Sequence, residues 1–179
     1  MTTPDPETVL SFWREAGPPR WYKKDPAFDA EIRSRFEAAH MAAARRELDG
    51  WLDEAESALA LLLLLDQFPR NMYRGTAHQF ATDPLARTMA RIALTAGHDR
   101  VVETSMRQFF ILPFEHSERP ADQDRALALA QGDQELVKWA TIHRDIIMRF
   151  GRFPHRNALL GRETTAKEAA FLAEGGFAG

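Results

Sequence analysis

Cysteine is absent from this chain of 179 residues, which excludes disulfide bonds, thiolate zinc sites and a cysteine nucleophile. Positive charge is not in excess either, because the formal net charge is −3, and this argues against broad non-specific binding of nucleic acid. Long apolar runs are also missing. The longest, from Ala58 to Leu65, is far shorter than the about 20 residues that span a bilayer, so we expect no membrane partner.

Sequence motifs of several familiar sites are missing too. The chain has no HExxH motif, no glycine-rich phosphate loop and no EF-hand loop, and its six histidines include no pair at a familiar metal-ligand spacing. We therefore expect no cofactor and no metal, although His116, Glu118 and His143 could assemble a metal site in space. The first residues, MTTPDPETVL, lack the pattern of a signal peptide, and we expect a cytoplasmic protein.

The patterns that are present indicate helices. Asp-Pro pairs recur along the chain, and each fits an N-cap aspartate followed by proline at the first helical position. No segment alternates apolar and polar residues as a strand would. The expected helices cover about residues 6–16, 26–48, 53–68, 84–96, 102–112, 121–131 and 134–150, with a last one that begins at Thr165. The sequence therefore predicts one all-α domain over residues 1–179, a single compact array of about eight helices in antiparallel pairs.

One short motif occurs twice, as DQFPRNMYRG at residues 66–75 and as GRFPHRNALLGRE at residues 151–163. Each copy follows a strongly apolar helix. Proline lacks the N–H that a helix needs and restricts the residue before it, so we expect Pro69 and Pro154 to stop these helices. The glycine four residues after each asparagine could supply a residue with positive φ.

Asp66, in the first copy, is expected near the C-terminal end of a buried helix, where a carboxylate needs a cation as partner. Arg70 lies one turn further on. The two copies and their flanks carry a single acid before Glu163 but several arginines, namely Arg70, Arg74, Arg152, Arg156 and Arg162. One interpretation is a structural network that satisfies helix ends. The other is a surplus of arginines that binds a carboxylate or phosphate.

A third apolar helix is expected to stop at a proline, Pro113, and the polar residues His116, Ser117 and Glu118 follow. They could act in acid–base chemistry, or Ser117 or Glu118 could cap the next helix. His143, on the helix expected over residues 134–150, is either a hydrogen-bonded core histidine or a functional group. Three helices that end in this way suggest one shared polar end of a bundle.

An aromatic segment near the start, PPRWYKKDPAFD, contains Trp21, Tyr22 and Phe28 and follows Trp13. Aromatic packing over one end of the bundle explains it. If this segment has a functional role, we expect Lys23 and Lys24 to lie at the rim of the same polar end.

Together, these segments resemble the bacterial family known as domain of unknown function 924. The resemblance rests on LLLLLDQFPRNMYRGT, LPFEHSE followed by Gln123, RFGRFPHRNALLGRETT and RWYKKDPAFDAEIRSRF, and it extends from Val9 to Leu172. It implies an all-helical fold grouped with the tetratricopeptide-like proteins, and it supplies no reaction. The tetratricopeptide signature itself, with its spacing of about 34 residues, is not visible.

Two functional hypotheses follow. The first is an Arg/His/Asn-rich pocket for a small anionic ligand, formed by both copies of the motif as two halves of one site, with proton transfer if the protein is an enzyme. Its ligand-binding candidates are Asp66, Arg70, Asn71, Arg74, Arg152, His155, Arg156, Asn157 and Arg162, and its proton-transfer candidates are His116, Glu118 and His143. The second is a helical-repeat-like scaffold that binds a peptide or protein partner. RNA contact through the arginines is a weaker reading that the acidic net charge disfavours.

Overall fold

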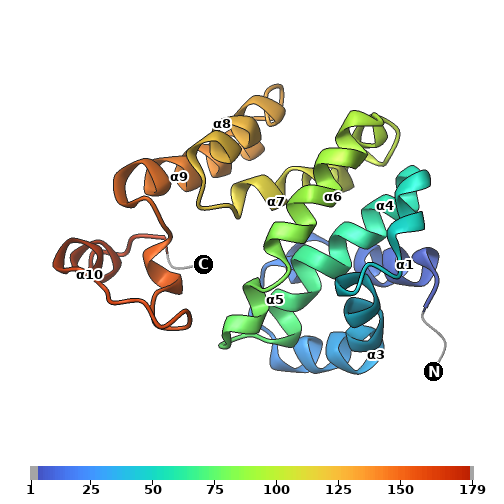
Figure 1. Ribbon diagram of the computed structural model, residues 1–179, viewed down its shortest axis with the longest axis horizontal. Coiled ribbons are helices and arrows are strands. Elements are labelled where there is room, and N and C mark those ends of the chain that lie inside the picture. The colour runs from blue at the N-terminus through green and yellow to red at the C-terminus, as the bar shows by residue number, and fades with distance from the viewer. Residues whose placement is uncertain (1–3, 178–179) are drawn as a thin grey trace. The chain divides into compact units, whose positions relative to one another are not determined.

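The computed structural model describes residues 4–177, and every regular element in that range is a helix (Figure 1). The predicted all-α class is confirmed. The chain divides into two compact units, with the boundary between Pro113 and Phe114, and each unit is described by itself. The single domain and the tetratricopeptide-like arrangement stay predictions. Within residues 4–177, no helix is long and apolar enough to cross a membrane.

The first unit begins with two of the predicted helix starts. Asp5 and Asp25 are N-caps whose carboxylates accept hydrogen bonds from first-turn N–H groups. At the third Asp-Pro pair, Thr82 is the N-cap and Asp83 is the first helical residue. The α-helices of this unit are α1 (Pro6–Ala16), α2 (Pro18–Trp21), α3 (Pro26–Ala44), α4 (Ala55–Leu62), α5 (Phe68–Met72) and α6 (Asp83–Thr95). Short 3₁₀ segments lie at Asp49–Asp53, Ala77–Phe80, His98–Arg100 and Thr104–Phe110.

The core of the first unit surrounds α4, which packs against α1 and α6. Every side chain from Ala58 to Leu65 is at most 1% exposed, as expected for a helix that is apolar on all sides. Aromatic rings fill the space beside it. Trp13 stacks on Trp21 with 5.9 Å between ring centroids, and the Trp21 indole N–H donates to the Trp13 carbonyl at 2.7 Å.

The apolar helix does not stop at Pro69, and this prediction was wrong. α4 continues through a π-helical turn, Leu63–Gln67, directly into α5, where Pro69 is the second residue. Pro69 has no N–H to donate to the carbonyls one turn earlier. The Leu65 carbonyl accepts the Thr82 hydroxyl at 2.6 Å instead, and the Leu64 carbonyl lies 2.8 Å from Nδ1 of His40. Donors from other elements therefore replace the missing N–H and let the helix go on.

The other two predicted proline stops were also wrong. Pro113 lies inside a short helix, α7 (Leu112–Glu115), and the segment before it is 3₁₀ rather than α. Pro154 comes after its helix has already ended at Gly151, which has φ of 70° and whose N–H donates to the Ile147 carbonyl at 2.8 Å. Glycine adopts this left-handed conformation without steric cost, so it ends the helix before the proline is reached.

The second unit contains a helix pair and a polar loop. Its longer helices are α8 (Pro120–Leu129), α9 (Gln134–Phe150) and α10 (Ala166–Ala173), and α8 packs against α9. The predicted capping box at Thr165 is confirmed, because the Thr165 N–H donates to Glu168 and the Thr165 hydroxyl accepts the Glu168 N–H. The positive φ expected for Gly75 and Gly161 is confirmed too, at 83° and 64°.

His40 is a fully buried histidine in the first unit. Because the Leu64 carbonyl can only accept, Nδ1 carries the hydrogen, and the other ring nitrogen, Nε2, is buried with no hydrogen-bond partner. The rings of Tyr73 and His78 lie 5.6 and 5.8 Å away. Burial lowers the pKa of His40, as does the charge of His78, and together they outweigh the opposite effects of the Leu64 carbonyl and Glu37.

This depressed pKa predicts loss of stability in mild acid. The unfolded chain takes up a proton at His40 below about pH 6.5 while the folded chain resists it, so the free energy of unfolding should decrease as the pH falls from there. His40→Asn keeps an N–H for Leu64 but cannot titrate. Urea unfolding between about pH 5 and 7 should therefore show a shallower decline for this variant. Equal slopes for both proteins would contradict the prediction.

Candidate functional site

Asp66 and Arg70 lie together in the first unit, as the sequence predicts. Asp66 is 1% exposed, and its Oδ1 lies 3.4 Å from Nη2 of Arg70. The same nitrogen lies 3.1 Å from Oδ1 of Asp83, and Nη1 donates to the Gln79 carbonyl at 3.1 Å. Burial alone would lower the pKa of Arg70, but the charges of Asp83 and Asp66 outweigh it and raise this pKa. Sequence reasoning missed Asp83, which was interpreted only as a helix cap.

Asn71 and Arg74 bind a different carboxylate, that of Asp29 on α3. Nε and Nη2 of Arg74 donate to its two oxygens at 2.7 and 3.1 Å. The Asn71 amide donates to Oδ1 of Asp29 at 2.7 Å. Arg70 therefore contacts two carboxylates, and Asn71 and Arg74 share a third.

An open depression of about 370 Å³ lies beside this group. Its lining residues are Lys24, Pro26, Asp29, Ala30, Arg33, Asn71, Met72 and Arg74. Three of them are cations and one is a carboxylate. Arg33 lies 3.2 Å from Glu37 in an exposed ion pair, and its guanidinium stands 5.6 Å from the Tyr73 ring centroid. The sequence hypothesis included Asn71 and Arg74, considered Lys24 only as a rim residue, and missed Arg33 and Asp29.

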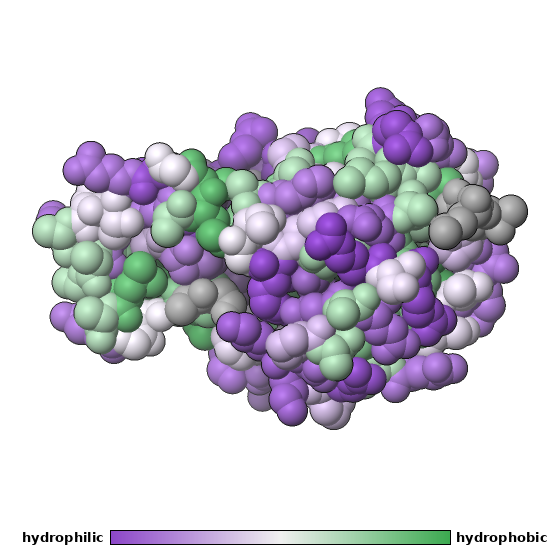
Figure 2. Space-filling model, turned by 90° about the horizontal axis from the view of Figure 1, so that it is seen from below, coloured by the Kyte–Doolittle hydropathy of each residue, from purple (hydrophilic) through white to green (hydrophobic). Residues whose placement is uncertain are grey.

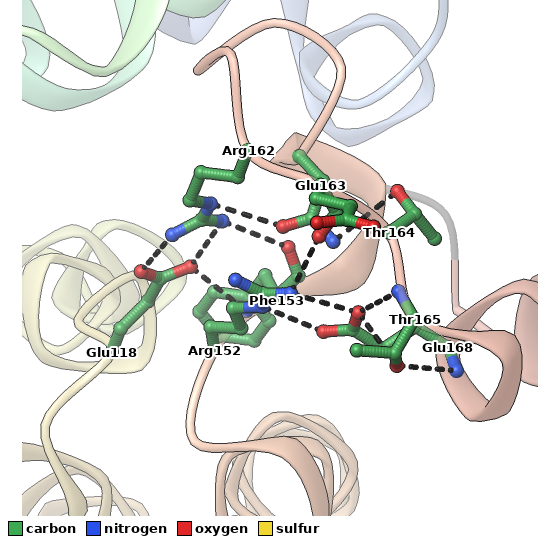
Figure 3. Close-up of polar contacts among 9 residues, drawn as sticks. Glu118, Arg152, Phe153, Arg162, Glu163, Thr164, Thr165 and Glu168 are labelled. Atoms are coloured by element: carbon green, nitrogen blue, oxygen red, sulfur yellow. Dashed lines mark hydrogen bonds and ion pairs between the residues drawn. The ribbon is translucent and has the colours of Figure 1, made fainter.

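In the second unit, Arg162 and Glu118 form a bidentate ion pair (Figure 3), with contacts of 2.6 and 3.0 Å. Arg162 also donates to the Asn157 side-chain oxygen at 3.0 Å and to the Phe153 carbonyl at 3.2 Å. The Phe153 N–H donates to Glu118 at 2.8 Å. Burial would raise the pKa of Glu118, but these hydrogen bonds, with the charges of Arg162 and Arg156, outweigh it and lower the pKa. Glu118 thus holds the loop after α9.

Arg152 forms a second bidentate pair in this loop, with Glu168 at 2.6 and 2.9 Å (Figure 3). The hydrogen bonds from Arg152 hold the pKa of Glu168 well below its usual range. Arg156 donates to the His116 carbonyl at 3.0 Å, and its guanidinium stands 4.5 Å from the Phe153 ring centroid.

The two motifs were counted as holding a surplus of arginines because the arginines were compared only with acidic residues inside the motifs themselves. Four carboxylates that pair with motif arginines come from other segments of the chain, namely Asp29, Asp83, Glu118 and Glu168. Sequence spacing gives no signal for these pairings, because the fold brings the partners together.

In the second unit, His143 lies beside Glu115. Nδ1 of His143 lies 3.5 Å from Oε2 of Glu115, which is 1% exposed, and 2.9 Å from the Trp139 carbonyl. The His116 ring lies 6.3 Å from that of His143. Glu115 stands in the EHSE segment, but sequence reasoning did not select it, because nothing in a short turn shows which carboxylate faces a distant helix.

Two neighbours fix the turn that carries Glu115. The Gln123 amide donates to the Glu115 and Ser117 carbonyls, each at 2.6 Å. The Ser117 hydroxyl donates to Asp122 at 2.7 Å and accepts the Arg119 N–H at 3.3 Å. Ser117 thereby holds the segment before α8, whose N-cap is Arg119 without a side-chain hydrogen bond, so the prediction that Ser117 or Glu118 caps this helix was wrong.

The two copies of the motif belong to different units, so their union in one site stays a prediction. Each copy is an arginine–carboxylate network beside helix ends, and the second unit adds an imidazole–carboxylate pair. Among residues 4–177, no three or more His, Asp or Glu side chains are grouped so that they could hold a metal ion.

These features define an all-helical protein in which four arginines of the two motifs, Arg70, Arg74, Arg152 and Arg162, are paired with buried or partly buried carboxylates. The profile of the family described as "Bacterial protein of unknown function (DUF924)" matches residues 9–176, and the chain belongs to this family. The resemblance predicted from the sequence is confirmed.

A solved structure is similar over nearly the whole chain. It is the structure of the protein of unknown function ATU0120 from Agrobacterium tumefaciens, with 56% sequence identity and a TM-score of 0.92. The match covers 94% of this chain and 97% of that one. The comparison with curated proteins gives no match. Neither description names a ligand or a reaction.

Proposed function

We propose that the protein binds a small anionic molecule in the depression of the first unit. The observation that carries the proposal is the charge of the lining, which includes three cations, Lys24, Arg33 and Arg74, and one carboxylate, Asp29. A concave surface with an excess of one charge attracts ligands of the opposite charge. A volume of about 370 Å³ suits a small molecule.

The cations of the depression have different roles in this proposal. Arg74 is held by both oxygens of Asp29, so it forms a fixed wall whose charge is largely offset. Lys24 and Arg33 are exposed, and the ligand charge is directed mainly to Lys24, because Arg33 shares its charge with Glu37 at 3.2 Å. An ammonium and a guanidinium at one rim favour a phosphate or carboxylate group over a neutral ligand.

Thermal unfolding and calorimetry with inorganic phosphate and citrate as probes test this proposal. We expect either anion to raise Tm at low salt, and we expect sodium chloride to weaken the effect. Lys24→Ala should weaken binding by about tenfold, because one charge-assisted contact is lost. Lys23→Ala is the matched control, since Lys23 is an exposed neighbour outside the lining. If Lys24→Ala and Lys23→Ala bind alike, or neither anion binds, the proposal fails.

The scaffold hypothesis requires an exposed apolar stripe at helical spacing. On α9, the exposed large apolar side chains are Trp139 and Met148, nine residues apart and therefore on opposite sides of the helix. On the face drawn in Figure 2, hydrophobic residues are scattered among hydrophilic ones. Such scatter is ordinary for a protein surface, so these observations favour the small anion over a peptide.

A further inference from the structure

We propose that Glu37 controls the anion affinity of the depression by holding Arg33, and that an anionic ligand takes Arg33 over from Glu37 when it binds. This inference rests on the proposed function, because it concerns the same depression. Glu37 is not one of the lining residues, so the affinity of the site is set in part by a residue behind its wall.

Arg33 and Glu37 form an ion pair that is easily broken. They lie one turn apart on α3, and Nη2 of Arg33 is 3.2 Å from Oε1 of Glu37. The Arg33 side chain is 56% exposed and that of Glu37 is 38% exposed. Exposed pairs of this kind add little to stability, because water screens their charges. Arg33 can therefore exchange Glu37 for another anion at little cost, and its place in the lining puts it beside such an anion.

Glu37 keeps a second partner when Arg33 leaves. The hydroxyl of Tyr73 donates to Oε1 of Glu37 at 3.0 Å, and Tyr73 is buried. Burial and this hydrogen bond raise the pKa of Tyr73 to about 12, so the hydroxyl still carries its proton at neutral pH. Glu37 is thus anchored at Tyr73 and stays in place as a competitor of the ligand for Arg33.

The other arginine of the lining, Arg74, is held too firmly to exchange in this way. It donates to both oxygens of Asp29, at 2.7 and 3.1 Å, and the Asp29 side chain is only 14% exposed. A bidentate pair with a partly buried carboxylate is stronger than a single exposed contact. Arg33 is therefore the arginine whose charge the ligand recruits.

Calorimetry with inorganic phosphate at low salt tests the competition. Glu37→Gln removes the negative charge, while its amide oxygen can still accept the Tyr73 hydroxyl. We expect this variant to bind phosphate several-fold more tightly than the wild type, because Arg33 no longer has a competing anion.

Glu31→Gln is the matched control. Glu31 pairs with Arg35 one turn further along the same helix, also at 3.2 Å and in the open, and neither residue lines the depression. The control makes the same change in net charge, and we expect it to alter the affinity by less than about twofold. Equal gains in Glu37→Gln and Glu31→Gln would reveal a general effect of net charge and would overturn the inference.

A double-mutant cycle shows whether the effect passes through Arg33. Arg33→Gln alone should weaken phosphate binding, because the cation that the ligand recruits is gone. In the Arg33→Gln background, Glu37→Gln should tighten binding much less than it does when Arg33 is present. If the gain is the same with and without Arg33, Glu37 acts only through its long-range charge and the inference is wrong.

The outcomes separate this inference from the proposed function. If the wild type binds phosphate, Lys24→Ala weakens this binding, and Glu37→Gln binds like the wild type, the proposed function stands and the inference fails. If phosphate and citrate bind neither to the wild type nor to Glu37→Gln, both fail.

Discussion

Replacing Arg70 by methionine is expected to lower the free energy of unfolding by about 3–5 kcal/mol, the cost of leaving a buried charge without its partner. The side chains of Asp66 and Asp83 are only 2% and 9% exposed, and both lie within 3.4 Å of the Arg70 guanidinium. Without that guanidinium, two carboxylates share a poorly hydrated space and repel each other. Urea unfolding measures the difference.

Two further variants make this result interpretable. Arg45→Met removes an exposed ion pair with Glu47 and should cost less than about 1 kcal/mol. Combining Arg70→Met with Asp66→Asn and Asp83→Asn removes the charges together and should recover most of the loss. If Arg70→Met costs no more than Arg45→Met, the two carboxylates are not held by Arg70 and the structural interpretation is wrong.

Replacing Arg162 by methionine is expected to destabilise the loop after α9 by about 2–3 kcal/mol, because several hydrogen bonds to charged groups are lost. Arg162 is the link between Glu118, Asn157 and the Phe153 carbonyl. Hydrogen exchange of the Phe153 amide, which donates to Glu118, is the local measurement. We expect this amide to exchange more than tenfold faster, at about 1.4 kcal/mol for each factor of ten.

The same variant separates the two interpretations of the motif arginines. Arg144→Met is a control, since Arg144 pairs with an exposed carboxylate, Asp124, on the helix pair of the same unit. Arg162→Lys keeps the charge but not the bidentate geometry. We therefore expect its effect on the free energy of unfolding to lie between those of Arg144→Met and Arg162→Met. Residues kept for a ligand are often neutral or stabilising when removed. A neutral or stabilising Arg162→Met would therefore favour a ligand over the structural network.

Local sequence patterns predicted most of the helices because their signals lie within one or two turns. The caps Asp5, Asp25 and Thr165, and the helix that runs from Gln134 to Phe150, were found in this way. The pair of Asp66 with Arg70 was also found, since one turn separates the two residues.

The proline stops were not predictable from the same patterns. Proline ends a helix when the orphaned carbonyls find no other donor. Here the donors Thr82 and His40 come from elements that are distant in sequence, so the helix continues past Pro69. The carboxylate partners of the motif arginines could not be predicted for the same reason, because they are distant in sequence. Glu118, for example, precedes Arg162 by 44 residues. That both motifs share one site, and that they bind a small anion, stay predictions.

The π-helical turn at Leu63–Gln67 contains one residue more than a regular α-helical turn. This extra residue rotates the side chains that follow it about the helix axis relative to those of α4. Deleting one residue there would restore ordinary α-helical bonding, but it would rotate everything that follows by about 100° about the helix axis. Arg74 would then turn away from Asp29 while the apolar side chains of α4 stayed in place. The irregular turn thus sets the direction in which Arg70 meets Asp66 and Asp83 and in which Arg74 meets Asp29.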